Sequence, residues 1–226
     1  MTSPTPSRPM RRMAAADAER FFATLRAANP QPASELEYTT VFELLAAVLL
    51  SAQATDVGVN KATRRLFAVA ATPQRMLALG VQGLEPYIRS IGLYRTKARH
   101  LIATCERLIA DHGGVVPRDR EALMALPGVG RKTANVVLNV AFGEPTFAVD
   151  THVFRVCNRT GLAPGATPLA VELGLQQRVP ERFRLHAHHW LILHGRYVCL
   201  ARRPLCERCQ VADLCDYALA RAGHLQ

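Results

Sequence analysis

Lysine is scarce in this chain of 226 residues: Lys61, Lys97 and Lys132 stand among 28 basic residues, and the other 25 are arginine. Arginine keeps its proton at any accessible pH and is a poor nucleophile, whereas lysine can lose its proton in a suitable environment and attack carbon. Because 25 of the 28 basic residues are arginine, only three side chains can supply a nucleophilic amine. Lys132, which follows two glycines, is the candidate nucleophile, and chance placement is the alternative.

Long apolar segments and an export signal are also missing. The longest apolar run, LLAAVLL at 44–50, is far shorter than the roughly 20 residues that a membrane-spanning helix needs. The N-terminal residues include proline, serine and arginine but no apolar core of a secretory signal, so we expect a flexible basic arm over 1–19. Without export, we expect the six cysteines in a reducing cytoplasm, where they bind metal or are simply buried.

Positive charge and helical patterning are abundant. A hydrophobic content of 49% predicts a sizeable core, and a net charge of +10 indicates a polyanionic partner such as nucleic acid. A solvated basic surface without a partner is the alternative. Apolar residues recur at intervals of three and four, which is typical of helices, and strand-like alternation is nearly absent. The predicted helices are 14–28, 40–53, 56–69, 73–79, 83–90, 95–112, 119–125, 131–142, 151–159, 168–178 and 184–198.

A glycine hairpin precedes the candidate lysine. Gly128, Val129 and Gly130 lie between two predicted helices, and glycine permits both positive φ and a close approach to another backbone. The following helix begins with N–H groups that favour an anion, so such a loop can bind a phosphodiester through its backbone. An ordinary helix–helix turn is the alternative. A nucleotide-binding P-loop is excluded because Arg131 separates Gly130 from Lys132.

Asp150 lies 18 residues after Lys132, in the segment FAVDTHVFRVCNRTG. Its position before a predicted helix makes it a good N-cap. A capping carboxylate keeps a second oxygen for chemistry, so a catalytic role is compatible with the structural one. In glycosidic cleavage a carboxylate stabilises the positive charge that develops on the sugar.

Four cysteines near the C-terminus have the spacing C-x6-C-x2-C-x5-C and can converge on one metal centre. They are Cys199, Cys206, Cys209 and Cys215. Structural zinc sites usually have two short cysteine pairs, whereas unequal spacing suits an iron–sulfur cluster, and the spacing alone leaves both open. Arg202 and Arg203 lie in the first interval, where they bind phosphate, offset the thiolate charge, or do both. Cys105 and Cys157 lie in predicted helices and are expected to be small buried hydrophobes.

These segments together resemble the endonuclease III family of DNA-repair enzymes, which are helix-hairpin-helix glycosylases. The resemblance covers about residues 20–220. The matching motifs, in order, are SAQATD, IGLY, LPGVGRKTANVVLN, AVDTH, CNRTG, HHWLILHGRY and the cysteine spacing.

The resemblance implies an all-α fold of two helical domains with a DNA cleft between them. One is a six-helix barrel with the helix-hairpin-helix, over 34–146. The other combines 20–33 with 147–226 around a 4Fe–4S cluster held by the four C-terminal cysteines. Lys132 matches the family's nucleophile and Asp150 its essential carboxylate.

Further residues receive roles from the same resemblance. Gln53 matches the residue that fills the gap left by an extruded nucleotide, and Leu93 matches a side chain wedged into the duplex opposite. His152 matches a residue near the substrate backbone, and Asp56 lines the substrate pocket. The hairpin residues Gly128, Val129 and Gly130, with Arg202 and Arg203, are expected to contact DNA.

The implied function is base-excision repair of oxidised pyrimidines and abasic sites in double-stranded DNA. Lys132 would form a Schiff base, and β-elimination would then cut the strand. We expect a monomer in a bacterial cytoplasm, associated with the nucleoid. One alternative is an adenine mismatch glycosylase of the same fold, which generally lacks the lysine and has a further domain beyond the cysteines. The other is a non-catalytic DNA-binding protein whose cluster senses redox state.

Overall fold

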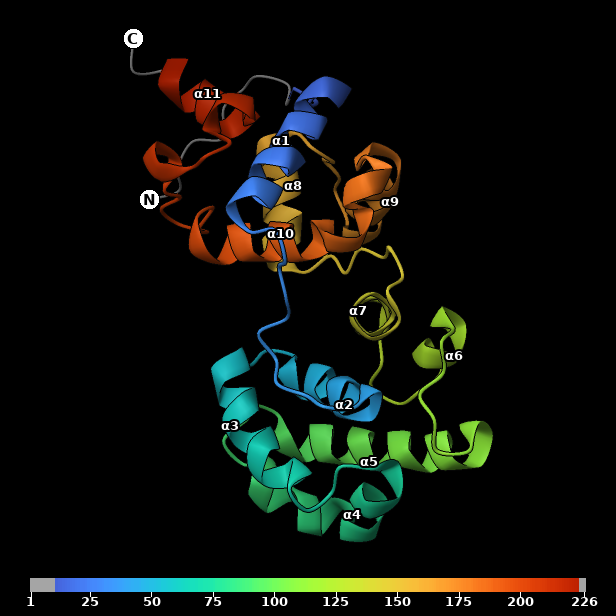
Figure 1. The fold of residues 1–226 in the computed structure, drawn as a ribbon. Coiled ribbons are helices and arrows are strands. Elements are labelled where there is room, and N and C mark those ends of the chain that lie inside the picture. The colour runs from blue at the N-terminus through green and yellow to red at the C-terminus, as the bar shows by residue number, and fades with distance from the viewer. Residues whose placement is uncertain (1–10, 224–226) are drawn as a thin grey trace. The chain divides into compact units, whose positions relative to one another are not determined.

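The computed structural model describes residues 11–223, and among these it contains helices but no strand, which confirms the predicted all-α class (Figure 1). The α-helices are α1 (Ala15–Ala28), α2 (Val41–Ser51), α3 (Asp56–Phe67), α4 (Pro73–Ile88), α5 (Tyr94–His112), α6 (Arg120–Met124), α7 (Arg131–Phe142), α8 (Thr151–Thr160), α9 (Pro168–Arg178), α10 (Arg184–Tyr197) and α11 (Asp216–Gly223). Short 3₁₀ helices lie at Glu181–Phe183, Cys206–Arg208 and Ala212–Leu214.

The predicted helices are confirmed, with ends that differ by at most two residues. The segments predicted as 73–79 and 83–90 form the single element α4, but Gly80 interrupts it with φ 62° and ψ 177°. The helix α11 was not predicted. It is short, and none of its residues is buried.

Side-chain caps explain where several helices begin. At α2, Thr40 Oγ1 accepts from the Glu43 amide at 3.1 Å, and the Glu43 carboxylate accepts from the Thr40 amide at 3.3 Å. This reciprocal pair satisfies two N–H groups that the helix itself leaves without partners. Single threonine caps of the same kind occur at Thr55, Thr72 and Thr167.

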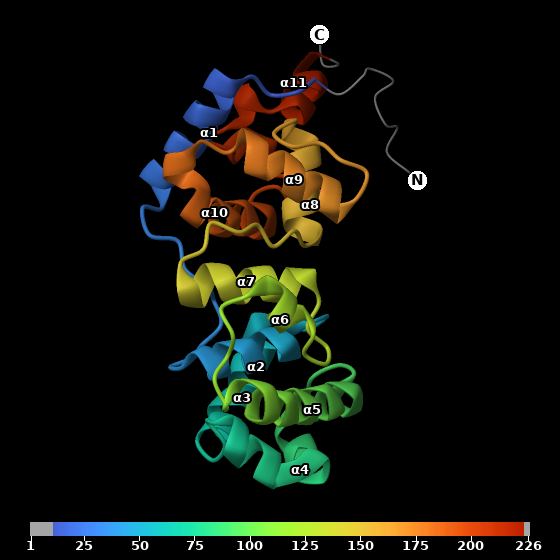
Figure 2. The ribbon, with the colours of Figure 1, turned by 90° about the vertical axis from the view of Figure 1, so that its right-hand side faces the viewer.

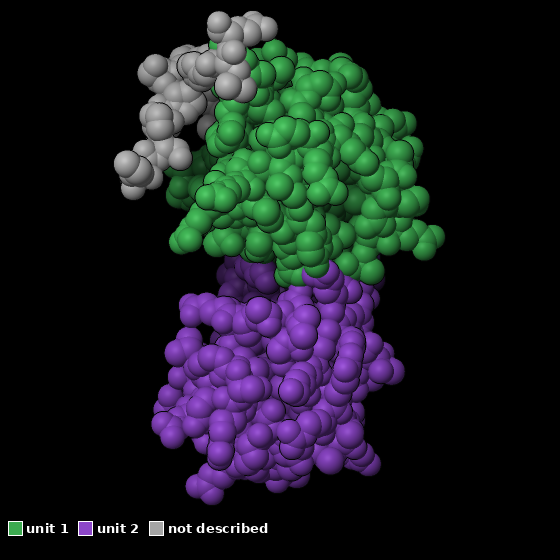
Figure 3. All heavy atoms as spheres, turned by 90° about the vertical axis from the view of Figure 1, so that its left-hand side faces the viewer, with its two compact units in different colours: residues 1–33, 145–226 green, residues 34–144 purple. Residues whose placement is uncertain are grey.

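The chain forms two compact units, coloured separately in Figure 3. Unit 2 is Ser34–Glu144 and contains α2 to α7. Its core is built around α2, which is buried from Phe42 to Leu50 and packs against α3, α5 and α7, while α4 packs against α5 (Figure 2). A helix that is buried on all sides has a continuous apolar sequence, which explains the run LLAAVLL in α2.

Unit 1 combines the described residues up to Ala33 with those from Pro145 onward. In it, α10 packs against α1 and α8, and α8 also packs against α9 and α11. Its core centres on aromatic rings: Phe22 stacks on Phe183 at 5.8 Å between centroids, and Phe183 meets Trp190 edge-on at 6.0 Å. This core holds α1 against the C-terminal half of the chain.

The expected arm over 1–19 is wrong for its last part. Met13 is 3% exposed, and its amide donates to the Gly161 carbonyl at 2.9 Å. The Arg178 guanidinium donates to the Met13 carbonyl, and α1 begins at Ala15. Burial of Met13 and these two backbone hydrogen bonds therefore fix this segment, and residues 1–10 lie outside the described part.

Two further expectations are tested by the fold. Cys105 and Cys157 are fully buried, as predicted, and burial raises the pKa of both thiols, that of Cys105 to about 12. Within residues 11–223, the length and polarity of every helix rule it out as a membrane span.

Candidate active site and cysteine loop

The glycine hairpin joins α6 to α7 and lies against α5. Gly128 has φ 76°, and a Cβ atom there would lie 2.7 Å from His100 Nδ1 and 2.9 Å from His100 Cβ, so only glycine fits. Thr104 of α5 donates its hydroxyl to the Pro127 carbonyl at 2.8 Å. The Val129 side chain is 5% exposed, so any contact of Val129 with DNA is through its backbone.

Lys132 is an exposed residue in the first turn of α7. Gly130 is the N-cap and supplies no capping side chain, and the first turn contains no acidic residue. The partial positive charge of a helix N-terminus favours an anion at this end and disfavours a second cation. The hairpin and the lysine thus lie at one electropositive helix end.

Gln53 and Leu93 are the two non-glycine residues with positive φ among those described, at 55° and 59°. Such backbone conformations cost on the order of 1–3 kcal/mol each and persist only where the surroundings enforce them. Both side chains are exposed, Leu93 by 62%. A Cβ at Gly92 would lie 3.9 Å from the Gln53 carbonyl, so the two turns are neighbours. Asp56 is half-buried at the start of α3.

Asp150 is the N-cap of α8, in unit 1, as the sequence predicts. Its Oδ1 accepts from the amides of His152 and Val153, each at 2.8 Å. Both bonds use the same oxygen, which leaves Oδ2 outside the cap. The carboxylate is half-buried and its orientation is fixed by the helix, which suits a group that must present one oxygen to a substrate.

His152 and Arg155 link the first turns of α8 to α10 and the cysteine loop. Arg155 Nη2 lies 3.1 Å from His152 Nδ1 and donates to the Gly195 carbonyl at 2.8 Å. Its Nε donates to the Cys199 carbonyl at 2.9 Å. A Cβ at Gly195 would lie 2.8 Å from His152 Cβ, so α8 and α10 approach closely here. A chain of contacts therefore leads from the Asp150 cap to the first cysteine.

The four C-terminal cysteines line one cavity of unit 1, between α8, α10 and α11. It contains about 340 Å³ of empty space, part of it open to solvent, and His194 and Tyr217 also line it. Among residues 11–223, no three His, Cys, Asp or Glu side chains are placed to hold a single metal ion. The four cysteines nevertheless line one shared space. An all-thiolate donor set suits a soft metal centre such as an iron–sulfur cluster.

Burial shifts the pKa of three of the four cysteines and of the neighbouring histidine. Burial raises the pKa of Cys206 and Cys209, and that of Cys215 to about 11. Burial lowers the pKa of His194 to about 4, and its Nε2 lies 3.7 Å from Cys209 Sγ. A metal centre at these cysteines would therefore displace protons as it binds.

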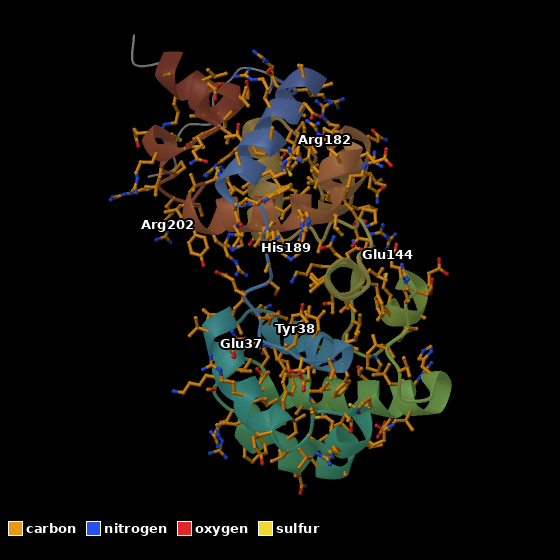
Figure 4. The ribbon with its side chains drawn as sticks, viewed as in Figure 1. Glu37, Tyr38, Glu144, Arg182, His189 and Arg202 are labelled. Atoms are coloured by element: carbon orange, nitrogen blue, oxygen red, sulfur yellow. The ribbon has the colours of Figure 1, made fainter. Side chains whose placement is uncertain are left out.

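Arg159 of α8 holds the beginning of the cysteine loop. Its Nη1 and Nη2 donate to the carbonyls of Leu200 and Ala201 at 2.6 and 2.7 Å, and Nη1 lies 3.5 Å from Cys199 Sγ. The guanidinium carbon also lies 4.9 Å from the centroid of the Tyr217 ring. Arg202, labelled in Figure 4, and Arg203 follow on this loop and are both exposed.

Arg155 and Arg159 contact the cysteine loop but are not among the residues singled out from the sequence. Each contacts the cysteine loop from about forty residues away in the chain. Their spacing of four along one predicted helix, just after Asp150, is the signal that could have singled them out, because residues four apart share a helix face. Their partners, however, are backbone carbonyls, which leave no trace in side-chain patterns.

Comparisons with known proteins agree with this architecture. Residues 46–181 match the HhH-GPD superfamily of base excision DNA repair proteins, and residues 199–215 match the iron–sulfur binding domain of endonuclease III. The second match confirms the predicted iron–sulfur cofactor. Endonuclease III of Escherichia coli (strain K12) is 62% identical over 193 residues, which cover 85% of this chain and 92% of the relative.

Two solved structures of endonuclease III with DNA are also similar. One is a trapped covalent intermediate, with a TM-score of 0.87 and 45% identity, and the other is a non-covalent complex, with a TM-score of 0.88 and 44% identity. Each alignment covers 93% of this chain and 99% of the other. From its helices, its hairpin, its cysteine loop and these matches, the chain belongs to the endonuclease III family within the HhH-GPD superfamily of base excision DNA repair proteins.

Proposed function

We propose that the chain is a bifunctional DNA N-glycosylase and abasic-site lyase that removes oxidised pyrimidines from double-stranded DNA and acts as a monomer. The observation that carries the proposal is the position of Lys132. It is exposed at the N-terminal end of α7, directly after a hairpin fitted against α5. A relative that was solved as a trapped covalent intermediate with DNA supports covalent chemistry in this family.

In the proposed reaction the neutral amine of Lys132 attacks C1′ of the damaged nucleoside, the glycosidic bond breaks, and the base leaves with a proton. The C1′–O4′ bond of the aminated sugar then breaks, O4′ takes up the second proton of the amine, and the nitrogen and C1′ are left as an imine. Loss of a C2′ proton and cleavage of the C3′–oxygen bond cut the strand on the 3′ side. Lys132 lies at the positive end of the α7 dipole, where a second cation is disfavoured.

Asp150 is proposed to stabilise positive charge on the sugar as the glycosidic bond breaks. Its capping bonds fix one oxygen and present the other. DNA engages both units in this proposal: Gln53 fills the gap left by the extruded nucleotide, Leu93 wedges into the duplex, and Asp56 lines the pocket. His152, the hairpin backbone, Arg202 and Arg203 bind the sugar–phosphate backbone.

The cysteine loop has a structural part in the proposal. Cys199, Cys206, Cys209 and Cys215 hold a 4Fe–4S cluster, which when bound supplies a rigid anchor for the loop that carries Arg202 and Arg203. Arg159 orders the same loop from α8 through two carbonyls. A loop ordered in advance presents its charges to phosphate at a low entropic cost.

The proposal is tested by borohydride trapping on a duplex with one abasic site. The wild-type protein should give a covalent protein–DNA adduct, and Lys132→Arg, which keeps the charge but not the nucleophile, should give less than about 1% of it. Lys61→Arg is the matched control, because Lys61 is an exposed lysine on α3 of the same unit. An undiminished adduct with Lys132→Arg would overturn the assignment.

Asp150→Asn separates the two roles of Asp150. Asparagine is as good an N-cap as aspartate, so the helix start should be kept while the charge is lost. Excision of thymine glycol should fall on the order of 100-fold, as expected when an electrostatic group is removed from a reacting centre. A variant that lost helix content instead, with an unchanged rate per folded molecule, would leave Asp150 as a cap alone.

The two alternatives predict other outcomes in the same assays. An adenine mismatch glycosylase would act on adenine opposite an oxidised guanine and not on thymine glycol. A non-catalytic redox sensor would bind both duplexes fully and cleave neither.

A further inference from the structure

Lys97 is a buried lysine of unit 2 that no role described so far uses. It is 5% exposed, although lysine is rarely buried unless its charge has a partner. Its ammonium group donates to the Leu50 carbonyl at 2.9 Å, and burial lowers the pKa of the amine. A cation held away from water at a single carbonyl is costly and therefore needs a reason.

The carbonyl that Lys97 binds belongs to the C-terminal turn of α2. Carbonyls in this turn have no amide partner within the helix and form the negative end of its dipole. In a continued α-helix the Ala54 amide would donate to the Leu50 carbonyl, but here it donates to the Ser51 carbonyl. The lysine thus supplies the missing donor and a positive charge at the end of α2.

The contact joins the two turns with positive φ. Gln53, at φ 55°, is three residues after Leu50. Leu93, at φ 59°, is the N-cap of α5, and its carbonyl accepts from the Lys97 amide at 3.0 Å. Lys97 is therefore bonded through its backbone to one turn and through its side chain to the helix that enters the other.

We propose that Lys97 is a positioning residue that fixes Gln53 and Leu93 relative to each other, so that both enter the duplex together when a nucleotide is extruded. This inference rests on the proposed function, since it assigns a shared task to two residues whose roles in DNA are themselves proposed. The ordinary alternative is a core lysine that stabilises the fold and has no selective effect on extrusion.

Single-stranded DNA distinguishes the two, because a base outside a duplex needs no extrusion. The test uses the cluster-loaded protein and measures single-turnover cleavage of an abasic site and of thymine glycol, each in duplex and in single-stranded DNA. Lys97→Met removes the donor and the charge but keeps an unbranched side chain. We expect a loss of about 10- to 100-fold on duplex, the scale of a small misplacement of reacting groups, and a loss below about twofold on single strands.

Two matched variants control for charge and for buried bonds. Lys61→Met removes an exposed charge from the same unit. Asn60→Ala removes a buried side chain that donates to the Glu35 carbonyl at 2.8 Å and accepts from the Glu37 amide at 3.0 Å, bonds that involve neither turn. Neither should change the ratio of duplex to single-strand rates. Lys97→Arg is the second test variant if Lys97→Met does not fold, because its larger guanidinium cannot keep the same contact without moving α2.

A double-mutant cycle then tests whether Lys97 acts through the two turns. In a Gln53→Ala, Leu93→Ala background, Lys97→Met should cost less than about twofold on duplex, because contacting residues are non-additive when one acts through the others. A full additional loss in that background, or equal losses on duplex and single strands, would overturn the proposal. Failure of the wild-type protein to cleave the abasic duplex would instead contradict the proposed function.

Discussion

The cysteine loop of unit 1 and the paired turns of unit 2 are both irregular segments with exposed side chains, yet they are held in different ways. Arg155 and Arg159 bind three successive carbonyls of the cysteine loop, from Cys199 to Ala201. Near the turns, the ammonium group of Lys97 on α5 binds one carbonyl, that of Leu50 at the end of α2. A forked guanidinium suits a run of carbonyls, and a compact ammonium suits one helix end, which gives a physical reason for lysine in an arginine-rich chain.

The difference predicts that arginine contacts in unit 1 govern stability, whereas the lysine contact in unit 2 governs function. Four changes test this comparison, from the largest expected effect to the smallest.

Arg159→Ala should have the largest effect. It removes two hydrogen bonds from a charged donor, each worth about 1.5–3 kcal/mol, and so should lower the free energy of unfolding by about 3 kcal/mol or more. Visible absorbance of the cluster should be lost in parallel. Arg178→Ala is the control, because Arg178 also binds two carbonyls in unit 1, those of Leu162 and Met13, and neither belongs to the cysteine loop. If both variants kept the cluster equally well, Arg159 would have no special relation to the loop.

Acid should destabilise unit 1 through His189, labelled in Figure 4. Burial, and secondarily the charge of His186, lowers the pKa of His189 to about 4, so the unfolded state binds a proton at a pH where the folded state does not. Stability from this histidine is complete above about pH 6.5 and falls, by up to about 3 kcal/mol, as the pH drops toward 4. His189→Leu should flatten that fall in denaturant titrations. An unchanged slope between pH 6.5 and 4 would contradict the assignment.

Lys97→Met should alter the free energy of unfolding by less than about 1.5 kcal/mol. The Leu50 carbonyl loses its donor, but relief from burying an ammonium group offsets much of that cost. The variant is expected to unfold at nearly the wild-type denaturant concentration while it loses activity on duplex DNA. A loss of stability as large as that of Arg159→Ala would remove the contrast between the two units.

Leu93→Gly should have the smallest effect, and it should be stabilising. Glycine accepts φ 59° without strain, and an exposed leucine loses little burial, so a gain of up to about 1 kcal/mol is expected together with reduced activity on duplex. Val69→Gly is the control: it is also an exposed apolar residue outside a helix but has no positive φ, so it should destabilise. Destabilisation by both changes would mean that Leu93 is not strained.

Local patterns in the sequence predict the helices well, because most of them bury an apolar face with a regular period. The cap at Asp150 and the burial of Cys105 and Cys157 were accessible for the same local reason. The segment around Met13 was not, since its order depends on Gly161 and Arg178, far away in the chain.

Side chains that act on backbone carbonyls were the hardest to predict. Lys97, Arg155 and Arg159 all bind carbonyls 40 or more residues away, and a carbonyl has no residue identity that a pattern could match. Lys97 was visible only as a scarce residue type. The positive φ of Gln53 and Leu93 was equally hidden, because neither residue is one that favours this conformation.

The most direct test of the account is to identify the residue that becomes linked to DNA. The wild-type protein is trapped with borohydride on an abasic duplex, digested, and analysed by mass spectrometry. The account predicts that the modified peptide carries the sugar remnant on Lys132. Modification at Lys61, at Lys97 or at the N-terminal amine in place of Lys132 would contradict it.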